Sequence, residues 1–152
     1  MSSNKLAINK AVLNCDHENN QTYSGAFKTV TINGCSNIQL QDVITEVIII
    51  KDSLVAIENL TINANQLAFE ATESVVMITN AHIQGDTGLQ LSGSRLDLAG
   101  VSIQAQGFAI KADTHSQVLM SVSDIQSSHY QGWVQGGFEL EQQTLASALL
   151  IQ

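Results

Sequence analysis

The chain of 152 residues carries a formal net charge of −8, from 6 Lys and Arg against 14 Asp and Glu, and 44% of its residues are hydrophobic. This acidity excludes nucleic acid and anionic membranes as partners, and we expect it chiefly to favour solubility. The length and the hydrophobic share predict a single domain over residues 1–152.

The beginning of the chain contains no targeting or membrane signal. Residues 1–10 lack the long apolar run of a signal peptide, and no segment approaches the roughly 20 apolar residues of a membrane span. We therefore expect a soluble protein, cytoplasmic by default, or a piece of a larger or non-classically exported protein.

The N-terminal part is less regular than the rest. We expect a cap or an irregular first coil over residues 1–26, because the apolar segments between Asn9 and Val47 are unevenly spaced. The polar, turn-rich segment 15–24 predicts a protruding loop. Cys15 and Cys35 have no close metal-ligand spacing and predict two reduced thiols, with a disulfide between neighbouring coils as the alternative.

Residues 47–126 repeat with a period of about 20 residues, and each repeat contains three short segments. The first type is Val47–Ile49, Leu67–Phe69, Leu89–Leu91 and Phe108–Ile110; the second is Val55–Ile57, Val75–Met77, Leu96–Leu98 and Val118–Met120; the third is Leu60–Asn63, Ala81–Gln84, Val101–Gln104 and Ser123–Gln126. Apolar and polar residues alternate within each segment, as in strands. The pattern predicts an all-β parallel β-helix with three short parallel sheets, about six or seven coils and regular coils over residues 27–126.

Composition supports a stacked-strand fold. The chain has no proline, which would remove a hydrogen bond from a paired strand, and its 10 glycines fall largely between the apolar segments. Turns between strands often need the backbone angles that glycine allows.

The third segment type carries the clearest ladder, in which Ile62, Ile83, Ile103 and Ile125 are separated by 21, 20 and 22 residues. If these isoleucines point inward, their neighbours form two outward rows at a coil spacing of about 4.8 Å. We predict that these rows bind a ligand; they are Thr61, His82, Ser102 and Asp124, and Asn63, Gln84, Gln104 and Gln126. A stabilising ladder of hydrogen-bonded amides is the alternative role of the second row.

Residues 127–152 are expected to form the last coil and a C-terminal cap. Tyr130, Trp133 and Phe138 cluster there, and we expect their rings to seal the end of the core, with sugar contact as the alternative. On this reading Trp133 can begin a last coil in register with Phe108. Residues 144–151 are apolar enough for a capping helix or a last strand, or for an interface through which copies stack end to end.

This repeat, strongest over residues 47–126, resembles the single-stranded right-handed parallel β-helix superfamily, which contains pectate lyases, polygalacturonases and many phage and bacterial polysaccharide-binding domains. The resemblance implies a right-handed parallel β-helix with uronic-acid or other polysaccharide ligands on the outer surface of one sheet. Catalytic members generally have more coils and long insertions that build a cleft. The short turns here therefore favour a role without catalysis.

A lyase of this shape would need carboxylates to bind calcium and a strong base to remove a proton. The catalytic candidates are Glu70 and Lys111, expected at one outward position together with Ser92, and Glu73, Arg95 and His115 in the turn that follows. A hydrolase would instead need paired carboxylates. The alternative is that these residues form a surface ladder of mutually compensating charges with no catalytic role, because acidic pairs do not recur at a shared position.

Three weaker motifs have simpler explanations. His82, Ser102 and Asp124 contain the residue types of a catalytic triad, but stacking places the serine between the other two. Residues 86–88 match the Asp-Thr-Gly signature of aspartic proteases within an expected turn. His17 with its two acidic neighbours offers too few fixed ligands for a metal.

We expect a non-enzymatic β-helix module that binds a polysaccharide or a protein partner through an elongated polar face. The alternatives are a small polysaccharide lyase or glycoside hydrolase acting on a uronic-acid polymer, and a self-assembling structural β-helix. We expect a monomer or a homo-oligomer joined end to end or face to face. No cofactor is expected, unless the carboxylates recruit calcium.

Overall fold

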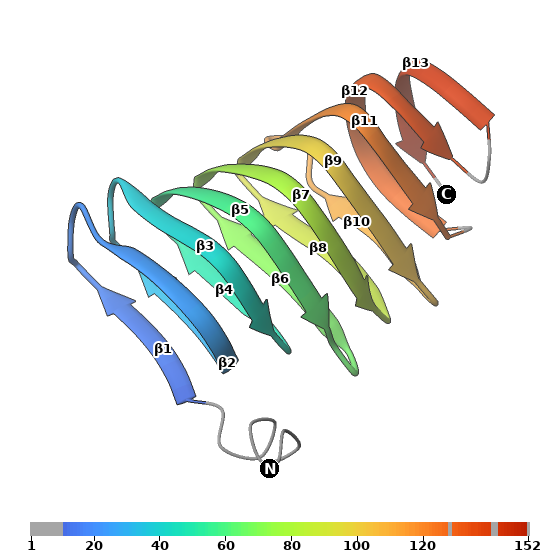
Figure 1. The fold of residues 1–152 in the computed structure, drawn as a ribbon. Helices are drawn as coiled ribbons and strands as arrows, with labels where there is room; N and C mark the ends of the chain where they lie inside the picture. The colour runs from blue at the N-terminus through green and yellow to red at the C-terminus, as the bar shows by residue number, and fades with distance from the viewer. Residues whose placement is uncertain (1–10, 128, 141–142, 152) are drawn as a thin grey trace, which may run out of the picture.

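The computed structural model describes residues 11–127, 129–140 and 143–151, and over these residues the fold is an all-β parallel solenoid of about six turns (Figure 1). The strands are β1 (Ala11–Asp16), β2 (Thr22–Asn33), β3 (Ile38–Thr45), β4 (Ile48–Lys51), β5 (Leu54–Asn63), β6 (Leu67–Thr72), β7 (Val75–Gly85), β8 (Thr87–Ser92), β9 (Arg95–Ala105), β10 (Phe108–Ala112), β11 (Gln117–Gln126), β12 (His129–Leu140) and β13 (Gln143–Ile151). The predicted fold class is confirmed. In the part of the chain that the structure describes, no helix is long and apolar enough to cross a bilayer.

Neighbouring coils pair in parallel along the solenoid. The long strands β3, β5, β7, β9 and β11 form one series and the short strands β4, β6, β8 and β10 form another. One strand joins the two series at each end, because β2 pairs with both β3 and β4, and β12 pairs with both β10 and β11. A single hydrogen-bonded sheet therefore wraps around the core where three separate sheets were expected.

Each long strand combines the second and third segment types, because the corner between them needs only one residue. That corner residue has a positive φ: it is Asp42 (54°), Asn59 (61°), Asn80 (60°), Gly100 (68°) or Val122 (48°) on successive coils. Gly, Asn and Asp enter the left-handed region most readily, so the chain turns without interrupting the ladder. Val122 is the exception, since a β-branched residue is strained there.

The predicted register of the third segment type is confirmed. Ile62, Ile83, Ile103 and Ile125 pair on successive coils, and each is at most 1% exposed. Both outward rows follow the same pairing. A buried isoleucine between two polar neighbours fixes which residues face outward, because a one-residue slip would bury the polar side chains.

The predicted alignment is displaced in the first segment type and, in the second, at the segment 75–77 alone, since Val55, Leu96 and Val118 share one register position as predicted. Ile48, and not Ile49, pairs with Phe69. In the second type, the buried row passes through Val76, and Val75 points outward. Ile49 is 38% exposed and Val75 is 43% exposed, so apolar residues occupy outward positions at both places. The alignment depended on the alternation of apolar and polar residues, and this alternation is not visible where several apolar residues follow one another.

Buried serines stack inside the corner between the short and the long strands. Ser53, Ser74, Ser94 and Ser116 are each at most 8% exposed, and we call them the serine ladder. The backbone N–H groups of Ser53, Ser74 and Ser94 each donate to the hydroxyl of the next serine at 3.1 Å. The hydroxyls of the same three serines donate to the carbonyl two residues earlier. These buried polar groups are therefore satisfied within the corner.

The two cysteines lie at the N-terminal end of this ladder. The backbone N–H of Cys35 donates to Ser53 Oγ at 2.9 Å, so Cys35 occupies the next ladder position. Cys15 points into the core one coil earlier, and the two form a disulfide. The prediction of two reduced thiols was wrong because the sequence does not show that the corner brings these positions together.

The segment 15–24 follows the coil and does not form the predicted protruding loop. Residues 15 and 16 end β1 and residues 22–24 begin β2. Between them Asn19 bridges to Ser36 on the next coil, and Asn37 Nδ2 donates to Asn20 Oδ1 at 2.7 Å. The polar residues belong to an ordinary coil whose side chains face outward.

The C-terminal end is covered by strand pairing. β12 continues the parallel ladder through all three sides of the coil, and β13 pairs with it antiparallel (Figure 1). Residues 144–151 therefore form the last strand and not the capping helix. The backbone partner of Phe108 on this coil is His129, while Trp133 pairs with Leu149, so the predicted Trp133–Phe108 register is wrong. The side chains of Tyr130, Trp133 and Phe138 lie outside the described part.

Candidate functional site

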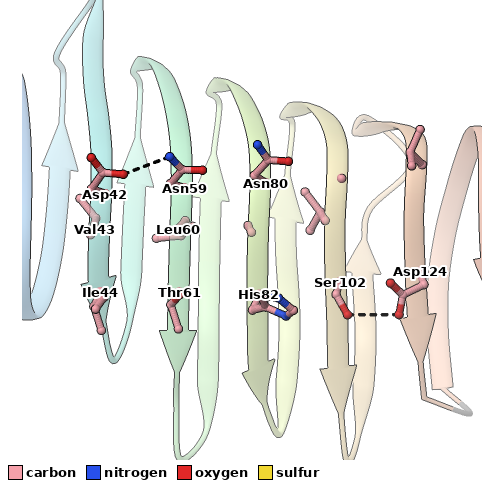
Figure 2. Close-up of a pocket in the computed structure, with 14 residues that line it drawn as sticks. Asp42, Val43, Ile44, Asn59, Leu60, Thr61, Asn80, His82, Ser102 and Asp124 are labelled. Atoms are coloured by element: carbon pink, nitrogen blue, oxygen red, sulfur yellow. Dashed lines mark hydrogen bonds between the residues drawn. The ribbon is translucent and has the colours of Figure 1, made fainter.

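A groove of about 620 Å³ runs along the solenoid on the outer side of β3, β5, β7, β9 and β11 (Figure 2). We call it the axial groove. The floor of the groove lies over residues whose side chains point into the core, so that little more than backbone faces outward there. These residues are Val43, Leu60, Ala81 and Val101, each at most 4% exposed. Because the coils stack in register, the groove is long and crosses all five strands.

Two rows of side chains border the axial groove. The first consists of the corner residues Asp42, Asn59, Asn80, Gly100 and Val122, and the second of Ile44, Thr61, His82, Ser102 and Asp124. Figure 2 shows the two rows at different heights along the same strands. A side chain on Gly100 would approach Asn80 Oδ1 to 2.8 Å, so glycine leaves the asparagine carbonyl exposed to the groove.

Hydrogen bonds between coils hold both ends of the groove. Asn59 Nδ2 donates to Asp42 Oδ1 at 3.0 Å, and Ser102 Oγ donates to Asp124 Oδ2 at 3.1 Å (Figure 2). Each carboxylate keeps further acceptor positions, since an ionised carboxylate accepts about four hydrogen bonds. The rows therefore present preorganised carboxylates, amides, hydroxyls and an imidazole to a ligand.

The amide row borders a second, smaller groove of about 470 Å³ on the same side of the solenoid. Gln84, Gln104 and Gln126 line it together with Asp86, and Gln104 Nε2 donates to Gln126 Oε1 at 3.2 Å. That hydrogen bond supports the role of a stabilising amide ladder, while the exposed amides also remain available to a ligand. All eight predicted binding residues thus lie on one face.

The catalytic candidates divide between two places. Glu73, Arg95 and His115 line a shallow hollow of about 350 Å³ at the corner that contains the serine ladder. Arg95 Nε lies 3.6 Å from Asp97 Oδ1, which is an ion-pair distance but too long for a good hydrogen bond. Exposed pairs of this kind contribute little to stability.

Glu70 and Lys111 lie outside this hollow, on the short strands. The residue between them is Gln90, which pairs with both, and not the predicted Ser92. Lys111 Nζ lies 5.5 Å from the centre of the Phe108 ring, within cation–π range. The structure therefore does not bring the five candidates into one cleft.

Beside the hollow, Asp113 organises the turn between β10 and β11. Its carboxylate accepts hydrogen bonds from Ser116 Oγ at 2.8 Å, the His115 backbone N–H, the Gly93 N–H and Ser92 Oγ. Burial by itself would raise the pKa of Asp113, but these four donors outweigh it and hold the pKa below its usual range. This aspartate stabilises the turn and is not free to act as a general base.

The triad-like and metal-like motifs agree with their simpler explanations. Ser102 lies between His82 and Asp124 and donates to Asp124, so the geometry of a triad is not formed. His17 Nδ1 lies 2.6 Å from Asp16 Oδ1, and among the described residues no three His, Cys, Asp or Glu side chains are placed to hold a metal ion. Asp86 lies in the bend between β7 and β8, but Thr87 and Gly88 begin β8, so only the first residue of this motif lies in the expected turn.

Sequence reasoning missed the corner row. Asp42, Asn59 and Asn80 precede the outward residues of the second row by two positions, but the third segment type was read from Leu60 onward. The recurring asparagine was a usable signal, because asparagine is enriched at positive φ. A search for repeated Asn, Asp or Gly at the repeat interval would have found most of this row.

Comparison of the chain with protein-family models, with curated protein sequences and with solved structures found no match. The fold is therefore assigned from the structure itself. The likeness to pectate lyases remains a resemblance of repeat pattern.

Proposed function

We propose that this protein is a non-enzymatic β-helix module that binds an extended carbohydrate chain in the axial groove. The observation that carries this proposal is that two rows of side chains border the groove in register on successive coils, with polar members at Asn59 and Asn80 in one row and from Thr61 to Asp124 in the other. A linear polymer of similar repeat length can place one sugar against each coil, at steps of about 4.8 Å.

The chemistry of the groove favours a sugar over a peptide strand. The backbone groups of the long strands already pair with neighbouring coils, so the groove has no free strand edge for a peptide to extend. The groove is lined by the exposed apolar side chains of Ile44 and Val122 and by polar groups that include Asn59, His82 and Ser102. Sugar rings present apolar faces and hydroxyl edges, which match such a mixed lining.

A glycan-binding screen with a paired set of variants tests the proposal. Asn80→Gly and His82→Ala remove side chains from the two borders while leaving the buried residues intact, and we expect either to weaken binding about three- to tenfold. Glu70→Gln on the short strands is the control and should bind as the original protein does. Binding that depends on Glu70 but not on Asn80 or His82 would contradict the proposal.

The second candidate is a small polysaccharide lyase at the corner hollow, favoured by the clustering of Glu73, Arg95 and His115. An absorbance assay for unsaturated uronate products, with and without calcium, tests it. Product formation that is lost in Arg95→Ala would establish the lyase, while unchanged activity in that variant would exclude Arg95 from the chemistry.

A further inference from the structure

The charged side chains are distributed unevenly around the solenoid. The two grooves are lined by three aspartates, Asp42, Asp86 and Asp124, and by no lysine or arginine. The four basic residues in the described part are Lys28, Lys51, Arg95 and Lys111, and none of them lines either groove. The two grooves therefore carry carboxylates with no lysine or arginine beside them.

This charge distribution acts against the uronic-acid polymers that the family resemblance implies. A polyuronate would bring a row of carboxylates alongside Asp42 and Asp124, with no lysine or arginine in the groove to offset the repulsion. Like charges placed together oppose binding and are a common means of excluding the wrong partner. The acidic groove therefore disfavours polyanions.

We infer that the axial groove is selective for a cationic amino-sugar polymer, such as a β-1,4-linked glucosamine chain, and this inference rests on the proposed carbohydrate-binding function. Asp42 and Asp124 lie four coils apart, about 19 Å at a spacing of about 4.8 Å per coil. Each accepts one hydrogen bond from a neighbouring coil and keeps acceptor positions for an ammonium group. Hydroxyl groups of the intervening sugars meet Asn80 and His82.

The effect of charge on binding can be tested separately from the effect of groove shape, because two corners of this chain carry an aspartate at positive φ. Asp42 (φ 54°) lies at the axial groove and Asp52 (φ 49°) at the opposite corner, away from both grooves. Asparagine tolerates the same backbone conformation, and it can still accept the hydrogen bond from Asn59. Asp42→Asn and Asp52→Asn therefore change the net charge equally at different places.

The experiment measures binding of three oligosaccharides of equal length at mildly acidic pH and low salt: the glucosamine oligomer, its fully N-acetylated form and an oligogalacturonate. We expect the glucosamine oligomer to bind most tightly and the galacturonate least. Asp42→Asn should weaken binding of the glucosamine oligomer about two- to fivefold, the range of an exposed ion pair, and leave the N-acetylated oligomer unaffected. Asp52→Asn should change neither.

The outcomes separate this inference from the proposed function. Equal binding of all three oligomers, tightest binding of galacturonate, or equal losses in Asp42→Asn and Asp52→Asn would overturn the amino-sugar selectivity and leave carbohydrate binding intact. Failure of all three oligomers to bind would overturn the amino-sugar selectivity, whereas the proposed function is overturned only if no glycan of the screen binds. Melting curves of the two variants confirm that they fold before binding is compared.

Discussion

Two of the three corners of each coil use polar residues in opposite ways. At the corner between short and long strands, the serine ladder points inward and its hydroxyls form hydrogen bonds with the backbone. At the corner within each long strand, Asn59 and Asn80 point outward and border the axial groove. A recurring polar residue in a solenoid therefore indicates function only when it faces solvent, because inward-facing polar residues are explained by the hydrogen bonds that the backbone needs.

The largest effect should come from the inward side of the groove strands. Ile83 is 1% exposed, and Ile83→Ala should lower the free energy of unfolding by about 2–5 kcal/mol through lost burial and a cavity. His82→Ala, one residue earlier and facing outward, should change it by less than about 0.5 kcal/mol. Urea unfolding of both variants measures the difference. Similar losses in the two would contradict the assigned orientation of β7.

The serine ladder should be the next most sensitive feature. Ser74→Ala leaves the buried N–H of Ser53 without its acceptor, at an expected cost of about 1–3 kcal/mol. Ser121→Ala, at an exposed position, is the matched control and should be nearly neutral. If the two variants unfold at the same urea concentration, the buried hydrogen bonds of this corner do not stabilise the fold.

The outward corner offers a stabilising change. Val122 has φ 48° and is 87% exposed, so Val122→Asn relieves backbone strain without losing packing and should raise stability by about 1 kcal/mol. The reverse substitution, Asn80→Val, should lower it by about 1–2 kcal/mol. Thermal unfolding compares the pair, and a Val122→Asn protein less stable than the original would show that the corner is not strained.

The smallest effect concerns Asp113 and depends on pH. Because its folded pKa is lowered, its contribution to stability is present above the unfolded value of about 3.9 and is lost as pH falls through the folded pKa. The difference in melting temperature between the original protein and Asp113→Asn should therefore shrink as pH falls below about 4. A difference that stays constant from neutral to strongly acidic pH would exclude this linkage.

The sequence predicted the parts of the fold that a strict period marks. Ile62 and its equivalents gave the register of the third segment and both outward rows, because each isoleucine stands between polar residues. The serine ladder repeats at the same intervals of 21, 20 and 22 residues. The sequence does not show whether such small polar residues face the core or the solvent until the geometry of the corner is known. The disulfide depends on that corner too, and so it was not predictable from the spacing of Cys15 and Cys35.

The candidate site was predictable in part. The second row was found because it flanks the buried isoleucines, whereas the corner row needs knowledge that one residue makes the turn. The grouping of Glu73, Arg95 and His115 was found, but the alignment error in the first segment type put Ser92 where Gln90 lies. The first limit was the unrecognised one-residue turn, and the second was the register, which apolar runs leave undefined.

The most direct test of the binding site is a map of backbone amide chemical shifts during titration with the oligosaccharide that binds best in the screen. We expect changes concentrated on β5, β7 and β9 around residues 59–61, 80–82 and 100–102, with β6 and β8 unaffected. Changes concentrated on the short strands or around Arg95 and His115 would contradict the claim that the axial groove is the binding site.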